Sequence, residues 1–229
     1  KKFNIMDMNS IIIIIFSFLI GSIPSAYLVG KKLKNIDLTQ KGSRNTGVSN
    51  LTQNTTLYTS LPVIFFDLII KGFLPIFLCS DLIFSLDITT KILCGMVSLI
   101  GHNWSIFLNF KGGRGIATLV GIILALDYNL FVIFTGIIAI GYLFSPIKDS
   151  AFWWIISTIC TPLYTIILGL TIELTLFTFM LSFVIILKRL LSNKEETKAK
   201  ISINLILLRL FFDRDIYDRK KWINRNIDK

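Results

Sequence analysis

One stretch of the chain concentrates residues that could bind an anion. Residues 101–118, GHNWSIFLNFKGGRGIAT, hold the single histidine, His102, and two cations, Lys111 and Arg114. Glycine adds no side chain and permits positive φ, so backbone N–H groups in this run can converge beside a fixed cation and bind an anion. The apolar run from Ile116 predicts a helix whose positive end faces the same point. The glycines of the run are Gly112, Gly113 and Gly115.

The pattern therefore predicts a phosphate site at the mouth of a membrane helix. The alternative is a glycine-rich turn whose two cations extend to lipid headgroups. A Walker A loop is excluded, because its glycine and lysine spacing is absent.

A second polar stretch, residues 37–50, reads DLTQKGSRNTGVSN. Its hydroxyl, amide and backbone N–H groups could wrap a phosphate, although many polar loops have such a composition. The small polar residues of this stretch are Gly42, Ser43, Asn45, Gly47, Ser49 and Asn50.

The composition fixes the class of protein that must position these groups. Of 229 residues, 53% are hydrophobic, and continuous apolar runs recur at lengths that cross a bilayer. A membrane β-barrel is excluded because the runs do not alternate. We expect an all-α integral membrane protein with seven spans in residues 1–200 and a tail at 201–229. The expected spans are about 10–30, 57–84, 88–100, a run over 116–144 that Asp127 divides into two helices, 151–170 and 172–187.

The distribution of lysine and arginine orients these spans. With the N-terminus outside, 20 of the 24 cations fall in segments that face the cytoplasm. This orientation places the C-terminus and both polar stretches on the cytoplasmic face. The net charge of +10 therefore indicates membrane topology, and we expect no nucleic-acid partner.

Asp67 and Lys71 lie four residues apart inside the second span, so on a helix they share a face and can pair. Charged residues within a span are often functional, and the equal alternative is a neutral pair that fixes helix packing. The three cysteines, Cys79, Cys94 and Cys160, lack metal-ligand spacing, so no metal site is expected.

Each terminal region of the chain has two possible interpretations. The apolar run after Lys1 and Lys2 could be a signal peptide, but it continues past residue 27 without an A-x-A pattern, which favours a retained first helix. Residues 201–212 are apolar but too short to span, and charged residues with one Trp follow them. We expect an interfacial helix on anionic lipid, and the alternative is a frayed tail.

Four segments resemble, in order and spacing, the bacterial acyl-phosphate:glycerol-3-phosphate acyltransferases, the PlsY family. They are GSIPSAYLVGK (21–31), KGSRNTGVSN (41–50), FDLIIKGFLP (66–75) and GHNWSIFLNFKGGRGIAT (101–118). The resemblance implies a seven-helix enzyme of the bacterial inner membrane that acylates the 1-hydroxyl of glycerol 3-phosphate from acyl phosphate at its cytoplasmic face. Lysophosphatidic acid and phosphate would be the products. No cofactor, metal or obligate protein partner is implied beyond the substrates and membrane lipids.

The same resemblance implies roles for individual residues. Ser43 matches the family's essential serine, Arg114 matches a cation of the second motif, and His102 belongs to the G-H-N-W element; these three are the expected catalytic residues. The expected substrate-binding residues are Gly42, Asn45, Gly47, Asn50, Asn103, Lys111, Gly112, Gly113, Gly115, Lys148 and Ser150.

The sequence also departs from the family pattern. Gln53 occupies the place of an arginine, Phe183 that of a histidine and Ile186 that of an asparagine. We expect Lys148, Lys188 or Arg44 to replace the lost cations. Two alternatives remain: a non-catalytic paralogue that binds a phosphorylated lipid, and a small transporter. The transporter is the weaker one, because no internal repeat is visible and the charges gather on one face.

Overall fold

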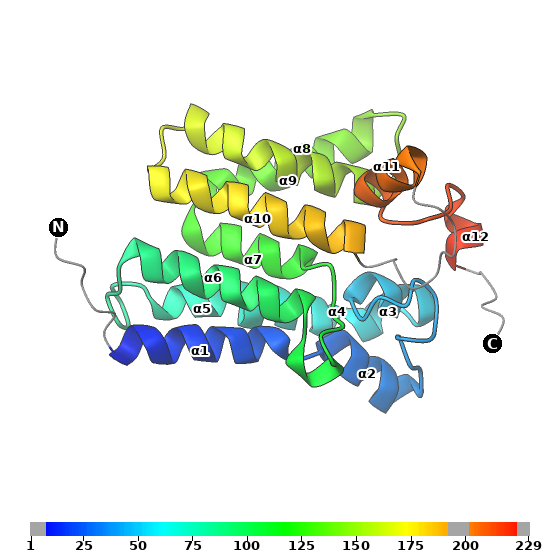
Figure 1. Cartoon of the computed structure of the whole chain (residues 1–229), viewed down its shortest axis with the longest axis horizontal. Helices are drawn as coiled ribbons and strands as arrows, with labels where there is room; N and C mark the ends of the chain where they lie inside the picture. The colour runs from blue at the N-terminus through cyan, green and yellow to red at the C-terminus, as the bar shows by residue number, and fades with distance from the viewer. Residues whose placement is uncertain (1–7, 192–201, 224–229) are drawn as a thin grey trace.

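The computed structural model of the chain describes residues 8–191 and 202–223, and every named element in this part is helical. Figure 1 shows α1, α6, α7, α9 and α10 side by side along the long axis, with α2, α3, α11 and α12 gathered at one end. The elements are α1 (Met8–Ser22), α2 (Ser25–Lys34), α3 (Val48–Asn54), α4 (Leu57–Phe65), the π-helix η1 (Phe66–Phe73), α5 (Leu74–Leu78), α6 (Ile88–Asn103), the 3₁₀ turn η2 (Ile106–Leu108), α7 (Ile116–Leu126), α8 (Tyr128–Phe144), α9 (Ser150–Ile167), α10 (Ile172–Leu191), α11 (Ile203–Phe212) and α12 (Arg219–Ile223).

Four helical stretches are long and apolar enough to cross a membrane: Met8–Lys34, Leu57–Leu78, Ser150–Ile167 and Ile172–Leu191. Shorter apolar helices cover Ile116–Leu126, Tyr128–Phe144 and Ile203–Phe212. The all-helical membrane class is thereby confirmed. Length and composition identify four spans in the described chain, so the expected total of seven stays a prediction.

Two expected spans have different boundaries in the structure. The first run is divided at Pro24, which has no N–H to continue the backbone ladder, so α1 and α2 are separate helices. The second ends at Leu78 rather than near residue 84, because residues 79–85 form a turn that includes Ser85 at φ 48°. The expected break at Asp127 is confirmed: its carboxylate accepts from the N–H of Leu130, 2.7 Å away, and begins α8.

The outward faces of the helices are apolar and the inward faces carry small residues. On α1, Ser17 and Gly21 are buried, whereas Ile12 and Ile15 are each 55% exposed. Small and hydroxylated residues at helix contacts are typical of membrane bundles, where the surrounding lipid is as apolar as leucine. Hydroxyls also join the helices of this bundle, since Ser157 of α9 donates to the carbonyl of Phe134 on α8 over 2.7 Å.

The second membrane stretch changes to a π-helix where it carries its charges. Pro75 has no N–H and leaves the carbonyl of Lys71 without its α-helical partner. The hydroxyl of Ser98 on α6 donates to that carbonyl over 2.6 Å. Gly72 and Gly121 then let η1 and α7 lie backbone to backbone, since a methyl group on either would collide with a main-chain carbonyl of the other helix. Single π turns inside α-helices are frequent at functional sites.

Candidate active site

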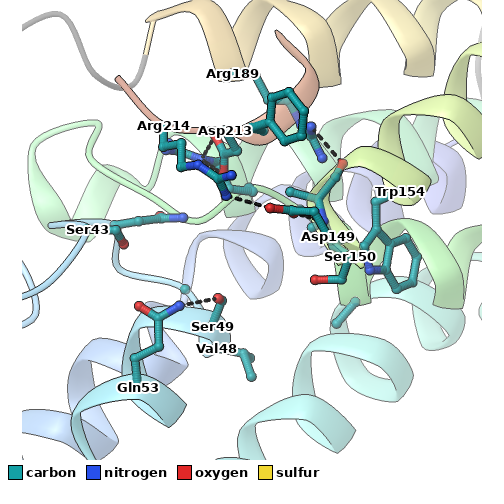
Figure 2. Close-up of a pocket in the computed structure, with 18 of the residues that line it drawn as sticks. Ser43, Val48, Ser49, Gln53, Asp149, Ser150, Trp154, Arg189, Asp213 and Arg214 are labelled. Atoms are coloured by element: carbon teal, nitrogen blue, oxygen red, sulfur yellow. Dashed lines mark hydrogen bonds and ion pairs between the residues drawn. The ribbon is translucent and has the colours of Figure 1, made fainter. Parts of the chain in front are cut away.

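A cavity of about 410 Å³ opens at the end of the bundle where α3, α11 and α12 gather. Figure 2 shows Ser43 and Gln53 at its left and Asp149, Ser150 and Trp154 at its right. Its polar lining residues are Ser43, Asn45, Gly47, Ser49, Gln53, Asp67, His102, Arg114, Gly115, Asp149, Ser150, Arg189, Asp213, Arg214 and Arg219. Apolar groups from α4, η1, α7, α9 and the C-terminal residues complete the wall.

The loop 37–50 is held in shape by one buried amide, that of Asn50. Its side-chain nitrogen donates to the carbonyls of Leu38, Lys41 and Asn45 at 3.1, 2.9 and 2.9 Å. Its side-chain oxygen accepts from the N–H of Ser43 at 3.1 Å. Asn50 thus uses both ends of its amide to close the loop and fix Ser43 at the cavity. Gly42 lies within this closure at φ +60°, where a methyl group would strike the Asn50 side chain.

Several polar groups of the cavity have no protein partner within the described chain. The Ser43 hydroxyl makes no hydrogen bond there, and the side-chain oxygens of Asn45 and Gln53 are buried without one. Buried polar atoms normally have a partner in protein, water or ligand. These side chains are therefore available to a polar ligand.

A buried network lies at the base of the cavity. Lys71 is 2.7 Å from Asp67, and the Ser25 hydroxyl donates to the same carboxylate oxygen over 2.6 Å. The Nδ1 atom of His102 lies 3.4 Å from the Lys71 ammonium and 3.3 Å from the Thr118 hydroxyl. The pairing of Asp67 with Lys71 is thus present as expected, and Asp67 and His102 both reach the cavity.

The glycine run, residues 112–115, packs closely against the C-terminal end of α6. The N–H of Gly113 donates to the carbonyl of His102 over 3.0 Å, and a methyl group on Gly113 would collide with the His102 ring. A methyl group on Gly112 would strike the carbonyls of His102 and Asn103. The run therefore positions His102. Of its four residues, Arg114 and Gly115 line the cavity. Gly115, at φ +76°, begins α7 as expected.

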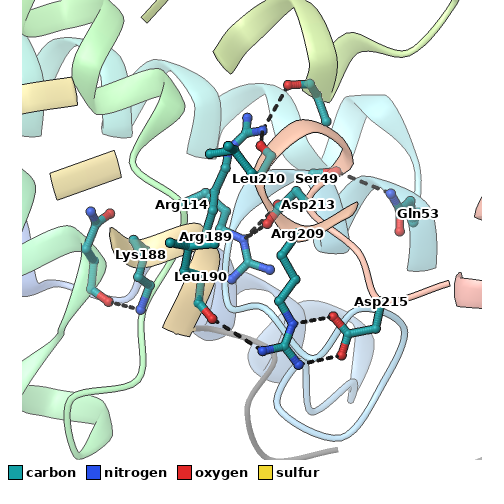
Figure 3. A network of polar contacts seen from close by, with 12 residues as sticks. Ser49, Gln53, Arg114, Lys188, Arg189, Leu190, Arg209, Leu210, Asp213 and Asp215 are labelled. Atoms are coloured by element: carbon teal, nitrogen blue, oxygen red, sulfur yellow. Dashed lines mark hydrogen bonds and ion pairs between the residues drawn. The ribbon is translucent and has the colours of Figure 1, made fainter. Parts of the chain in front are cut away.

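Arg114 contacts a residue far along the chain. Its Nε atom lies 2.7 Å from both carboxylate oxygens of Asp213, which follows α11. Figure 3 shows this pair beside a second one, in which Arg209 meets Asp215 through two contacts of 2.7 and 2.9 Å. Residues within 202–223 therefore border the candidate site. Residues 202–223 are called the C-terminal segment below.

The turn before α9 joins the same network. Asp149 accepts from the N–H of Ala151 at 3.0 Å and meets the guanidinium of Arg214 at 2.5 Å. Arg189, at the end of α10, donates to the carbonyls of Ala151 and Leu210 at 3.0 and 2.9 Å. Two transmembrane helices are thereby joined to the C-terminal segment beside the cavity.

The structure brings together part of the set expected from the sequence. Seven of those residues line the cavity: Ser43, Asn45, Gly47, His102, Arg114, Gly115 and Ser150. Seven do not line it: Gly42, Asn50, Asn103, Lys111, Gly112, Gly113 and Lys148. Lys148 donates to the carbonyls of Tyr142 and Leu143 at the end of α8, and Asn103 is fully buried behind the glycine run.

The structure also shows where the residues that depart from the family pattern, and their expected replacements, lie. Phe183 is 64% exposed and does not line the cavity, so its side chain does not contribute to the candidate site. Lys188, expected as a replacement cation, contacts the Asn103 carbonyl and lies 5.1 Å from the Trp104 ring centre, outside the cavity lining. Arg44 is likewise absent from the lining, whereas Gln53 is part of it.

Sequence reasoning missed the contribution of the C-terminal segment. Contact of this segment with lipid stays a prediction, and in the structure Asp213, Arg214 and Arg219 line the cavity. Alternating charges in a short run are more typical of a solvated helix face, so the sequence carries no local signal for this placement.

Comparison with known proteins identifies the family. A family described as Glycerol-3-phosphate acyltransferase matches residues 11–199. The chain belongs to this family. "Glycerol-3-phosphate acyltransferase 5" of Dehalococcoides mccartyi is 33% identical over 225 residues, which cover 96% of this chain and 95% of that protein. The corresponding protein of Endomicrobium trichonymphae is 32% identical and covers 83% of this chain and 96% of its own length.

A solved structure has the same architecture. It is the crystal structure of PlsY (YgiH), an integral membrane glycerol 3-phosphate acyltransferase, in its glycerol 3-phosphate form. The two chains superpose with a TM-score of 0.72 at 25% identity, covering 87% of this chain and 98% of PlsY. Family membership and the membrane-protein class are therefore confirmed. The Dehalococcoides relative, which aligns with 96% of the chain, also matches part of the sequence beyond residue 199.

Proposed function

We propose that this protein transfers an acyl group from acyl phosphate to the 1-hydroxyl of glycerol 3-phosphate, giving lysophosphatidic acid and inorganic phosphate for phospholipid synthesis. One observation carries the proposal: the loop at Ser43, His102 and Arg114 meet in one cavity at the end of an apolar helix bundle. Relatives named for glycerol-3-phosphate acylation support the acceptor. The donor is inferred from the resemblance of residues 21–118 to the acyl-phosphate-dependent family.

The proposed reaction needs polar groups that stabilise developing charge and a defined position for the attacking oxygen. The glycerol oxygen attacks the carbonyl carbon of acyl phosphate, the bond from that carbon to the phosphate oxygen breaks, and the hydroxyl proton is transferred to the departing phosphate. Because acyl phosphate is already activated, no covalent enzyme intermediate is needed. Arg114 and the Ser43 hydroxyl would stabilise charge that develops on the phosphate and the carbonyl oxygen. His102, anchored by Lys71 and Thr118, would face the attacking oxygen.

The proposed topology follows from the charges. Seven spans, with the N-terminus outside, place 20 of 24 lysines and arginines in cytoplasmic segments. The cavity and the C-terminal segment would then face the cytoplasm from the bacterial inner membrane, where soluble glycerol 3-phosphate meets a membrane-borne acyl donor. A C-terminal reporter active only on the outer side would contradict this orientation.

The test uses purified protein in detergent with palmitoyl phosphate as donor. We expect phosphate release that depends on glycerol 3-phosphate and is not supported by glycerol. Ser43→Ala should remove most of this activity without lowering expression, because the hydroxyl makes no hydrogen bond in the described structure and fills no core position. Ser49→Ala, in the same wall, is the matched control, and a smaller loss is expected there.

An inactive parent protein would favour the alternative, a non-catalytic member that binds a phosphorylated lipid. In that case, binding of palmitoyl phosphate should persist and should weaken in Arg114→Ala. The departures from the family pattern at Gln53 and Phe183 are the features that favour such a binding protein.

A further inference from the structure

The C-terminal segment is a wall of the cavity with its own packing. Its helix α11 lies against α9 and α10, and the rings of Phe211 and Phe212 contact Phe152 of α9 at centroid distances of 5.8 and 5.9 Å. Phe212 and Trp222 both line the cavity. These apolar contacts, together with the ion pairs of Asp213 and Arg214, hold the segment beside the cavity.

Four arginines line the cavity, and three have protein partners that hold them. Arg114 is paired with Asp213, Arg214 with Asp149, and Arg189 donates to two main-chain carbonyls. The fourth is Arg219, at the start of α12. Within residues 8–191 and 202–223, its side chain makes no hydrogen bond and no ion pair. A cation at a cavity without a protein counter-charge is placed to meet an anionic ligand.

The position of Arg219 is defined by its flanking residues. The Asp218 carboxylate accepts from the N–H groups of Lys220 and Lys221 at 2.8 and 3.1 Å, and these bonds hold the pKa of that carboxyl below its usual value. Three residues after Arg219, Trp222 is only 5% exposed. Arg219 lines the cavity and the adjacent Lys220 and Lys221 do not, so the geometry separates Arg219 from its basic neighbours.

The α3 wall of the cavity offers polar groups but no cation. Gln53 donates to the Ser49 hydroxyl at 3.2 Å, while its own side-chain oxygen is buried without a partner in the described structure. Both proposed substrates carry phosphate, and two phosphates in one cavity repel each other unless cations offset their charge. The cavity therefore requires a cation whose donors are not already taken up by protein carboxylates or carbonyls.

We propose that Arg219 binds the phosphate of glycerol 3-phosphate and so completes the acceptor site from the C-terminal segment. This inference rests on the proposed function for the identity of the phosphate monoester. A guanidinium can donate two parallel hydrogen bonds to phosphate oxygens, which gives orientation as well as charge. Arg219 touches no reacting atom in this account, so its contribution is to acceptor binding.

The test compares two substitutions that remove the same charge from neighbouring positions. Arg219→Gln should raise the KM for glycerol 3-phosphate about 10- to 100-fold, the effect of losing a hydrogen bond to a charged group, with kcat within about twofold. Lys220→Gln should leave the KM unchanged, because Lys220 does not line the cavity. Adding Gln53→Arg to the Arg219→Gln protein should lower the KM again, because it returns a cation to the cavity. Equal KM values in Arg219→Gln and Lys220→Gln would overturn the proposal.

Direct binding separates this inference from the proposed reaction. Calorimetry with glycerol 3-phosphate, and with glycerol as the uncharged control, reports on Arg219 without turnover. If the parent binds glycerol 3-phosphate but transfers no acyl group, and Arg219→Gln abolishes the binding, the role of Arg219 is supported and the acyltransferase proposal fails. If the parent transfers acyl groups and Arg219→Gln binds the acceptor as tightly as the parent, the role of Arg219 alone fails. If the parent neither binds nor transfers, both proposals fail.

Discussion

The loop 37–50 and the C-terminal segment border the same cavity but are held by different interactions. In the loop, one fully buried amide satisfies three carbonyls and the N–H of Ser43. The C-terminal segment is fixed by ring packing and by ion pairs from Arg114, Arg209 and Arg214 to aspartates. The loop therefore depends on short-range hydrogen-bond geometry. The segment depends on charges that salt, a substrate phosphate or a single neutral substitution can compete with.

The largest expected effect is at Arg114, which lines the cavity that both regions border and pairs with Asp213 of the C-terminal segment. Arg114→Ala should lower kcat/KM about 10²- to 10³-fold, the usual loss when one preorganised donor to a developing negative charge is removed. Arg114→Lys should retain part of the activity, because it keeps the charge but loses the planar donor. Steady-state kinetics with palmitoyl phosphate measure both. Lys111→Ala is the control, and it should lose less because Lys111 does not line the cavity.

The second largest effect is expected in the loop 37–50, at Asn50. Asn50→Ala should destabilise the protein by about 2–4 kcal/mol, because several buried backbone groups lose their partner together. Thermal unfolding in detergent would show a lower Tm, with activity lost in parallel. Asn54→Ala removes one neighbouring amide with fewer contacts and should cost less. Equal Tm values for Asn50→Ala and the parent would show that the loop does not depend on this amide.

A smaller effect is expected at Gly113, where the added methyl group meets the His102 ring. Gly113→Ala should lower kcat more than it raises the KM for either substrate, because it displaces a side chain that faces the reaction rather than one that binds phosphate. Measured values of kcat and KM distinguish a displaced His102 from weakened phosphate binding. A change in KM alone would indicate that the glycine run binds the anion directly.

The smallest expected change is at Asp213, and its sign is opposite. Asp213→Asn should tighten phosphate binding a few-fold, because the carboxylate no longer competes with phosphate for Arg114. Titration with inorganic phosphate at low and high salt would measure it, with Asp215→Asn as the control because Asp215 pairs with Arg209 instead. Weaker phosphate binding in Asp213→Asn would mean that the carboxylate orients Arg114 rather than competing for it.

The sequence predicted the helical elements well where hydrophobic length determines them. The break at Asp127 and the start of α7 at Ile116 followed from the pattern, whereas the division at Pro24 and the early end at Leu78 required local backbone geometry. The pairing of Asp67 with Lys71 was predictable because it is local to one helix. The π-helix that carries the pair was not predicted, and the partner of its Lys71 carbonyl, Ser98, comes from another helix.

Prediction of the candidate site was limited in the same way. Ser43, His102 and Arg114 were found because their motifs are contiguous, and the structure places all three at one cavity. Asp213 lies 99 residues from Arg114, and no local pattern reveals a contact over that separation. The glycines of 112–113 were expected to bind phosphate, but a sequence cannot show that the His102 ring occupies the space beside Gly113.

Identification of the product tests both the proposed acyl donor and the roles of Ser43 and Arg114. Purified parent protein, Ser43→Ala and Arg114→Ala are incubated with glycerol 3-phosphate and either palmitoyl phosphate or palmitoyl-CoA, and lysophosphatidic acid is measured by mass spectrometry. We expect product from the parent with palmitoyl phosphate, almost none with palmitoyl-CoA, and a loss of about 10²-fold or more in Arg114→Ala. Product formation from palmitoyl-CoA alone, or equal product from all three proteins, would contradict this expectation.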